Sequence, residues 1–191
     1  FCRKAASNPG RDYFFIIDEI NRANISKVFG ELLMLIEREH REDKITLALN
    51  NEQFSVPRNV FIIGMMNTAD RGLALIDYAL RRRFAFFEMK PALENPAFRA
   101  AVEEAGGSKL IALVDAVINL NDTIAADPAL GRGFRIGHSY FCDDGSEDDV
   151  AQAIIRFEIA PLLEEYWFDD LERAETEIRR LEDAVRESDE Q

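Results

Sequence analysis

The sequence predicts an α/β core followed, from about residue 91, by a part built only of helices. Two apolar runs, 13–17 and 60–63, predict strands, and the first is typical of a strand buried on both faces of a parallel sheet. Each run ends in acidic or amide side chains. Beyond Pro91 the apolar residues recur at the three- and four-residue spacing of helices. We therefore expect residues 1–90 to form the α/β part and residues 91–191 a helical domain.

Composition narrows the classes of protein that fit. The chain has 191 residues, of which 47% are hydrophobic, enough for a sizeable core. Its net charge of -13 argues against a broad nucleic-acid-binding face, because phosphate contacts need clustered lysine and arginine. We see no run of membrane-spanning length and no basic-then-apolar leader, so we expect a soluble cytoplasmic protein without membrane contact. Cys2 and Cys142 are expected to be free thiols, and His40 and His138 are too few for a metal cluster.

The first part is expected to alternate strands and helices after a polar approach over residues 1–12. Residues 26–39 show a helical apolar stripe, with Ser26 as a candidate cap. Asn50-Asn51 is a turn signal that predicts a hairpin. The predicted elements are, in order, a strand at 13–17, a helix at 26–39, hairpin strands at 44–49 and 53–56, a strand at 58–66, a helix at 73–83 and a short strand at 84–89.

The second part is expected to be helical throughout. Its predicted helices cover 96–105, 109–125 and 148–167, and a Gly-rich connector lies at 131–141. Pro161 must kink or restart the third helix, because proline has no N–H to donate. The tail from Leu171 is amphipathic, and we expect it to pack on its own domain in preference to a coiled coil. Its apolar positions are Leu171, Ala174, Ile178, Leu181 and Val185.

Two carboxylates follow the first strand, where a parallel sheet places its ligands. Asp18 can hold Mg²⁺ directly or through water, since hard cations take carboxylate oxygens. Glu19 beside it can polarise an attacking water. This is the Walker B pattern of P-loop NTPases, although two acids at a strand end are also common by chance.

An amide side chain follows the second strand. Asn67 there can hydrogen-bond both an attacking water and a γ-phosphate, the role called sensor 1 in AAA+ ATPases. The plainer interpretation is a helix cap, which we favour for Thr68 and Asp70 but not for Asn67.

Three arginines, Arg81, Arg82 and Arg83, end the predicted helix 73–83. On a helical wheel, Arg82 points away from the apolar stripe and is the one most free to reach another subunit. Arg81 lies four residues after Asp77, so these two can pair. The arginines can simply complement the helix dipole, or Arg82 can act as an arginine finger on a neighbouring subunit's nucleotide.

Together these motifs resemble those of the McrB family of AAA+ NTPases, the motors of modification-dependent restriction systems. The resemblance extends over about residues 12–169 and implies the later part of an AAA+ core followed by an α-helical lid. It also implies GTP or ATP hydrolysis with Mg²⁺, a homo-oligomeric ring of hexamer type, and a nuclease partner of the McrC type. Three segments carry it: Asp18-Glu19-Ile20-Asn21-Arg22-Ala23-Asn24, Met66-Asn67-Thr68-Ala69-Asp70-Arg71 and Gly137-His138-Ser139-Tyr140-Phe141.

The resemblance also implies roles for individual residues. Asp18 resembles the metal-binding acid, Glu19 the catalytic base and Asn67 sensor 1. Arg82 resembles the arginine finger, and the network at the subunit boundary comprises Arg71, Asp77, Arg81, Arg82 and Arg83. From the lid, either His138 and Ser139 face the nucleotide or His138 is satisfied in the core. Arg132 and Arg135 are weaker candidates for phosphate contacts.

Two departures from the family pattern stand out. Gly72 occupies the position where the family usually has serine. More importantly, the sequence contains no G-x-x-x-x-G-K-[ST]; Gly106-Gly107-Ser108-Lys109 has the wrong order and follows a predicted helix. We therefore expect a fragment that binds nucleotide poorly by itself. In that case Walker A and any DNA-reading domain lie upstream, and DNA is reached only through that domain or a partner.

Two other functions remain open. One is a MoxR-like or dynein-like AAA+ ATPase with a chaperone role. The other is a non-hydrolysing ring or scaffold subunit that has lost its phosphate loop and only lends Arg82 to its neighbours.

Overall fold

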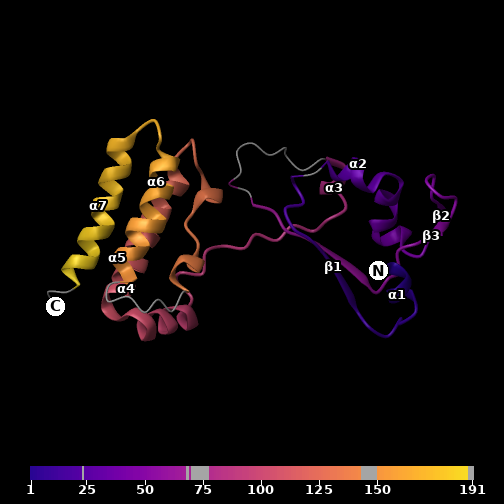
Figure 1. Cartoon of the computed structure of the whole chain (residues 1–191), viewed down its shortest axis with the longest axis horizontal. Coiled ribbons are helices and arrows are strands. Elements are labelled where there is room, and N and C mark those ends of the chain that lie inside the picture. The colour runs from indigo at the N-terminus through magenta and orange to yellow at the C-terminus, as the bar shows by residue number, and fades with distance from the viewer. Residues whose placement is uncertain (23, 68, 70–77, 143–149, 189–191) are drawn as a thin grey trace. The chain divides into compact units, whose positions relative to one another are not determined.

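The computed structural model describes residues 1–22, 24–67, 69, 78–142 and 150–188 (Figure 1). The chain divides into two compact units, Phe1–Phe87 and Glu88–Gln191. Each unit buries hydrophobic residues of its own, in two small clusters in the first and one large cluster in the second. The strands lie in the first unit, and the described residues of the second unit form helices and no strand.

The first unit is built on a parallel pair of strands, β1 (Tyr13–Ile17) and β4 (Val60–Gly64). Their register runs from Tyr13 opposite Val60 to Ile17 opposite Gly64, which confirms both predicted strands. The expectation that β1 is buried on both faces is wrong, because Phe14 is 57% exposed and Ile16 58%. Burial on both faces requires layers that cover the sheet, and among the described residues this sheet has two strands.

The helix predicted at 26–39 breaks early. After a short N-terminal helix, α1 (Cys2–Ala6), the next is α2 (Ile25–Phe29), followed by 3₁₀ turns at Gly30–Ile36 and Arg38–His40. The break occurs at Gly30, whose φ of 48° and ψ of -122° are not helical. The cap is Asn24 instead of Ser26, since the Asn24 side chain accepts a hydrogen bond from the Lys27 N–H at 3.0 Å.

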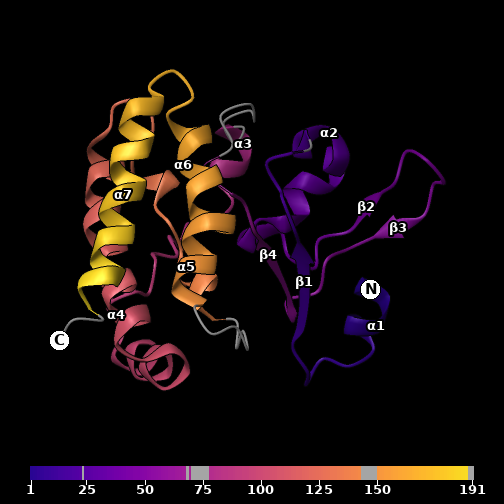
Figure 2. The ribbon, with the colours of Figure 1, turned by 60° about the vertical axis from the view of Figure 1, so that its left-hand side comes forward.

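The predicted hairpin is confirmed, with shorter strands. β2 (Ile45–Thr46) pairs antiparallel with β3 (Gln53–Phe54), and the hairpin projects from the rest of its unit (Figure 2). The strand predicted at 84–89 is wrong, because those residues are irregular and have no strand neighbour among the described residues. Of the helix predicted at 73–83, the structure describes α3 (Tyr78–Arg81).

In the second unit, α4 (Pro96–Ala126) covers the first two predicted helices, 96–105 and 109–125. It has a kink between them at Gly107, where φ is 61°. The Asn95 side chain caps it by accepting hydrogen bonds from the N–H groups of Ala97 and Phe98. The third predicted helix divides as Pro161 requires, with a π-helical turn between its two α-helical parts. Its parts are α5 (Val150–Ile154), the π turn (Ile155–Ile159) and α6 (Ala160–Tyr166).

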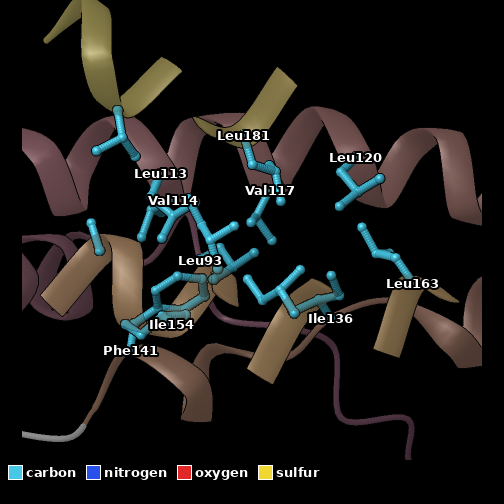
Figure 3. Packing of buried hydrophobic residues seen from close by; sticks show 14 of the residues in the cluster. Leu93, Leu113, Val114, Val117, Leu120, Ile136, Phe141, Ile154, Leu163 and Leu181 are labelled. Carbon is cyan, nitrogen blue, oxygen red and sulfur yellow. The ribbon is translucent and has the colours of Figure 1, made fainter. Parts of the chain in front are cut away.

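The tail forms α7 (Leu171–Glu187), which contacts α4 and α6 and thus packs on its own domain, as predicted. Leu181 of α7 and Val117 of α4 meet in the core together with Ile136 of the connector (Figure 3). The connector itself forms two 3₁₀ turns, Arg132–Phe134 and His138–Phe141. One predicted core position is wrong, because Leu171 is 55% exposed.

A buried polar cluster joins the end of α4 to α6 and α7. The Asp127 carboxylate, only 5% exposed, accepts hydrogen bonds from Trp167 Nε1 at 3.0 Å and from an Arg173 guanidinium N–H at 2.7 Å. The Arg173 guanidinium also lies 4.6 Å from the Trp167 ring centre. The hydrogen bond from Trp167, together with those from the Ala129 and Leu130 N–H groups and the nearby Arg173 charge, lowers the pKa of Asp127. We call the side chains of Asp127, Trp167 and Arg173 the Asp127 clamp.

Asp127→Asn is expected to destabilise the second unit by about 2 kcal/mol at neutral pH, because the charged acceptor of two hydrogen bonds becomes neutral. A lowered native pKa gives stability that is present above the ordinary aspartate pKa of about 3.9 and is lost as the pH falls through the native value. Urea unfolding at several pH values should therefore show that the free energies of unfolding of variant and parent become equal below about pH 4. Asp122→Asn, an exposed neighbour on α4, is the control; a pH-independent gap would contradict the assignment.

No helix among the described residues is long and apolar enough to cross a membrane. Cys2 and Cys142 are both free thiols, as predicted.

Candidate functional site

The carboxyl ends of β1 and β4 lie at the same edge of the sheet, and their pairing continues beyond the strands. The Met65 N–H donates to the Ile17 carbonyl at 2.8 Å, and the Ile20 N–H donates to the Met65 carbonyl at 2.9 Å. Asp18 and Glu19 therefore lie directly opposite Met65. Because Asn67 follows Met65 by two residues, the structure brings the acid pair and Asn67 to one edge.

The acid pair occupies a tight turn at this edge. The Asp18 carboxylate accepts a hydrogen bond from the Glu19 N–H at 2.9 Å, while the Asp18 side chain stays exposed. Glu19 has a φ of 49°, a left-handed conformation that non-glycine residues adopt at a cost in energy and that occurs often at functional sites. Its carboxylate, 49% exposed, forms an ion pair with Arg22 at 2.8 Å. The turn thus holds two carboxylates in solvent beside the strand ends.

Asn67 is tied to this turn through Asn21. The Asn21 side-chain amide donates a hydrogen bond to the Asn67 carbonyl at 3.3 Å. The loop after β1 thus holds the backbone of the segment that follows β4. The Asn67 side-chain oxygen accepts from the Ala69 N–H at 3.0 Å, which leaves the Asn67 amide N–H groups available as donors. The Asn21 side-chain oxygen is buried and has no hydrogen-bond partner among the described residues.

Asn21 is a residue whose role the sequence interpretation missed. Its contact joins two strand ends that are 46 positions apart in the sequence, so no local pattern indicated it.

The three arginines have different environments. Arg83 is an inward-facing residue, 20% exposed, in an ion pair with Glu37 of its own unit at 2.6 Å. Arg81 is exposed, with its guanidinium 6.0 Å from the Phe86 ring centre, and Arg82, which follows the end of α3, is also exposed. Arg71 and Asp77, the other predicted members of the boundary network, lie outside the described residues.

The lid candidates belong to the second unit. His138 Nδ1 accepts a hydrogen bond from the Ala92 N–H at 3.2 Å, and its ring lies edge-on to Phe98 at 5.8 Å between centres. These contacts agree with the alternative in which His138 is satisfied within its own domain. Ser139 is exposed.

The two arginines of the connector also differ. Arg135 forms an ion pair with Glu88 at 3.3 Å, and Arg132 is exposed. The connector is fixed to α4 by a reciprocal pair of hydrogen bonds. The Asn121 amide donates to the Ile136 carbonyl at 2.9 Å, and its side-chain oxygen accepts from the Ile136 N–H at 2.6 Å. Neither Asn121 nor the Asp127 clamp was foreseen from the sequence.

Comparisons with known families match the two units separately. The AAA domain of the dynein-related subfamily matches residues 3–84, and the α-helical lid domain of McrB matches residues 112–175. Both agree with the predicted order of an AAA+ core followed by a helical lid.

Two individual proteins are similar as well. The chain is 49% identical over 183 residues to the type IV methyl-directed restriction enzyme EcoKMcrB subunit of Escherichia coli (strain K12), covering 89% of this chain and 40% of that protein. It is 32% identical over 114 residues to the type II restriction enzyme BsuMI component YdiS of Bacillus subtilis (strain 168), covering 52% of this chain and 32% of that protein. The chain thus spans 40% or less of the length of either relative.

The motifs at the sheet edge agree with the AAA domain match, with the McrB lid match that follows it in the sequence and with the 49% identity to an McrB subunit. The chain belongs to the McrB-type AAA+ proteins.

Proposed function

We propose that this chain is part of the nucleotide-hydrolysing motor of a restriction system. The observation that carries the proposal is the shared sheet edge, where Asp18, Glu19 and Asn67 follow the ends of two parallel strands. Ligands of open α/β sheets bind outside the carboxyl ends of the strands. Both similar proteins are named as restriction-enzyme components, which supports the biological setting.

In the proposed site each side chain has one role. Glu19 accepts a proton from the attacking water, and Asn67 aligns that water with its amide N–H groups. Asp18 would hold Mg²⁺, which when bound would neutralise charge on the phosphates. Its exposed carboxylate fits that ion, because Mg²⁺ commonly takes one or two carboxylates and completes its shell with water and substrate phosphates.

The phosphates themselves need a phosphate-binding loop of the pattern G-x-x-x-x-G-K-[ST], which this sequence does not contain. We propose that an upstream segment of the same protein supplies it and covers the apolar sheet, where Phe14, Phe15, Ile16, Phe61 and Ile63 are between 41% and 58% exposed. Exposed apolar area of this extent marks a surface that another element covers. In the ring that we propose, a hexamer, Arg82 reaches the nucleotide of the next subunit.

The deciding experiment measures binding and turnover of GTP and ATP with Mg²⁺ in the complete gene product, with and without a nuclease subunit of the McrC type. We expect hydrolysis of GTP that increases with the nuclease subunit. The dynein-related AAA match supports a second candidate, a MoxR-like or dynein-like ATPase, for which ATP would be preferred and a nuclease subunit would have no effect. Tight binding without any turnover would instead indicate a non-hydrolysing scaffold subunit.

Asn21→Ala is expected to lower kcat about 10- to 100-fold with little change in KM, because losing the bond to the Asn67 carbonyl lets the aligning amide move away from the water. The isosteric Asn21→Asp cannot donate this bond and should behave alike. Steady-state kinetics of the complete protein check the prediction. Asn24→Ala is the matched control: it removes the cap of α2, so it should lower stability but spare kcat. Equal kcat in all four proteins would show that Asn21 does not position Asn67.

A further inference from the structure

The turn between α6 and α7 exposes two large apolar side chains, and exposed acidic residues precede and follow them in the sequence. Phe168 is 69% exposed and Leu171 55%. The acidic residues of the same segment are Glu164, Glu165, Asp169 and Glu172, all exposed. We call this surface, residues 164–172, the acidic corner.

The acidic corner is held in a fixed shape. The Asp170 side chain accepts a hydrogen bond from the Arg173 N–H at 3.2 Å and caps α7, and the Asp170 N–H donates to the Trp167 carbonyl at 2.9 Å. Beneath the turn, the Asp127 clamp buries Trp167, which is 3% exposed. Phe168 and Leu171 are therefore displayed by ordered backbone, and binding through them costs little further ordering.

The charge of the corner restricts what can bind to it. None of its four exposed carboxylates forms an ion pair with any described residue. The whole second unit has 25 acidic and 10 basic residues, whereas the first has 11 and 13. A nucleic acid is repelled by such a surface, and a protein with cations around an apolar contact is attracted.

The chain itself carries such a surface on its first unit. Arg81 and Arg82, at the end of α3, are exposed, and neither forms an ion pair with a described residue. Phe86, 51% exposed, lies beside Arg81 and supplies an apolar contact.

We propose that the acidic corner of one copy docks on the arginine end of α3 in a second copy. Two different surfaces then meet head to tail, and such a contact closes into a ring when its rotation allows. The inference rests on the proposed function, because it names the lid surface through which the proposed ring assembles. It also gives Arg81 a role separate from that of Arg82, which reaches the nucleotide.

The first test removes the apolar centre. Phe168→Ser with Leu171→Ser, in the complete protein with Mg²⁺ and a non-hydrolysable GTP or ATP analogue, should weaken assembly about tenfold or more, measured by sedimentation velocity over a concentration series. Phe157→Ser is the matched control, since Phe157 is also 69% exposed in the same unit. Unchanged thermal unfolding shows that the variants are folded. Assembly equal to that of the parent overturns the inference and leaves the ring intact, whereas a parent that stays monomeric overturns both.

The second test exchanges charges. Glu164→Lys with Glu165→Lys should weaken assembly, and adding Arg81→Glu should recover part of it, because opposite charges then face each other again. Recovery supports the head-to-tail contact. If adding Arg81→Glu does not recover assembly, the proposed contact is overturned. It is also overturned if the effect does not depend on protein concentration, because the contact then lies within one chain.

Discussion

Glu19→Gln is expected to abolish nucleotide hydrolysis in the complete protein while nucleotide binding and assembly persist. Glutamine keeps the size of the side chain but cannot take a proton from water, and loss of a general base typically lowers the rate about 10²- to 10⁴-fold. The geometry supports this choice of base, because Glu19 stands at the end of β1 in a left-handed conformation beside Asp18. Such strained backbone persists where surrounding structure enforces it.

Single-turnover hydrolysis and equilibrium binding, measured on the same preparation, separate the two effects. Glu39→Gln is the control, since Glu39 is an exposed carboxylate of the same unit away from the sheet edge. Turnover that survives in Glu19→Gln would remove Glu19 from its role. Loss of binding together with turnover would instead show that the substitution disturbs the turn, including the ion pair with Arg22.

The edge of the sheet was predictable because its signals are local. An apolar run that stops at polar residues marks both a strand and its end, and two such runs in a parallel sheet bring their ends together. The structure pairs 13–17 with 60–64 in this way. Periodicity likewise predicted the helices of the second unit, and Pro161 predicted the interruption between α5 and α6.

Contacts between distant residues were not predictable from local patterns. Asn21 meets Asn67 across 46 positions, Asp127 meets Arg173 across 46, and Arg83 meets Glu37 of its own unit. Each depends on how elements pack after they form. The Asp127 clamp shows the consequence, since nothing about a single aspartate after a helix indicates that it is buried.

Two of the wrong predictions share a cause. Apolar character predicted burial for β1 and a strand at 84–89, but both require neighbouring layers that the described residues do not supply. The early end of α2 has a local cause, because the backbone of Gly30 leaves the helical region and the apolar side chains Leu35 and Ile36 are buried from a 3₁₀ turn instead.

Arg82→Ala is expected to lower turnover about 10³-fold or more without weakening nucleotide binding to the same extent, because an arginine finger acts on charge that develops in the transition state. Arg82 directly follows α3 and is exposed, whereas Arg83 is engaged with Glu37. If the finger acts on a neighbouring subunit, a ring mixed from Arg82→Ala and Glu19→Gln subunits should regain activity. An intact site forms wherever the base comes from one variant and the arginine from the other, about one interface in four for equal, random mixing.

Steady-state turnover measured across mixing ratios checks this prediction, with each variant alone as the baseline. A peak near equal mixing supports a finger supplied in trans. Arg82→Lys distinguishes charge from shape, since lysine keeps the charge but lacks the planar guanidinium, and should recover only part of the rate. Mixtures whose activity never exceeds that of the two variants alone would show that Arg82 does not complete a neighbour's site.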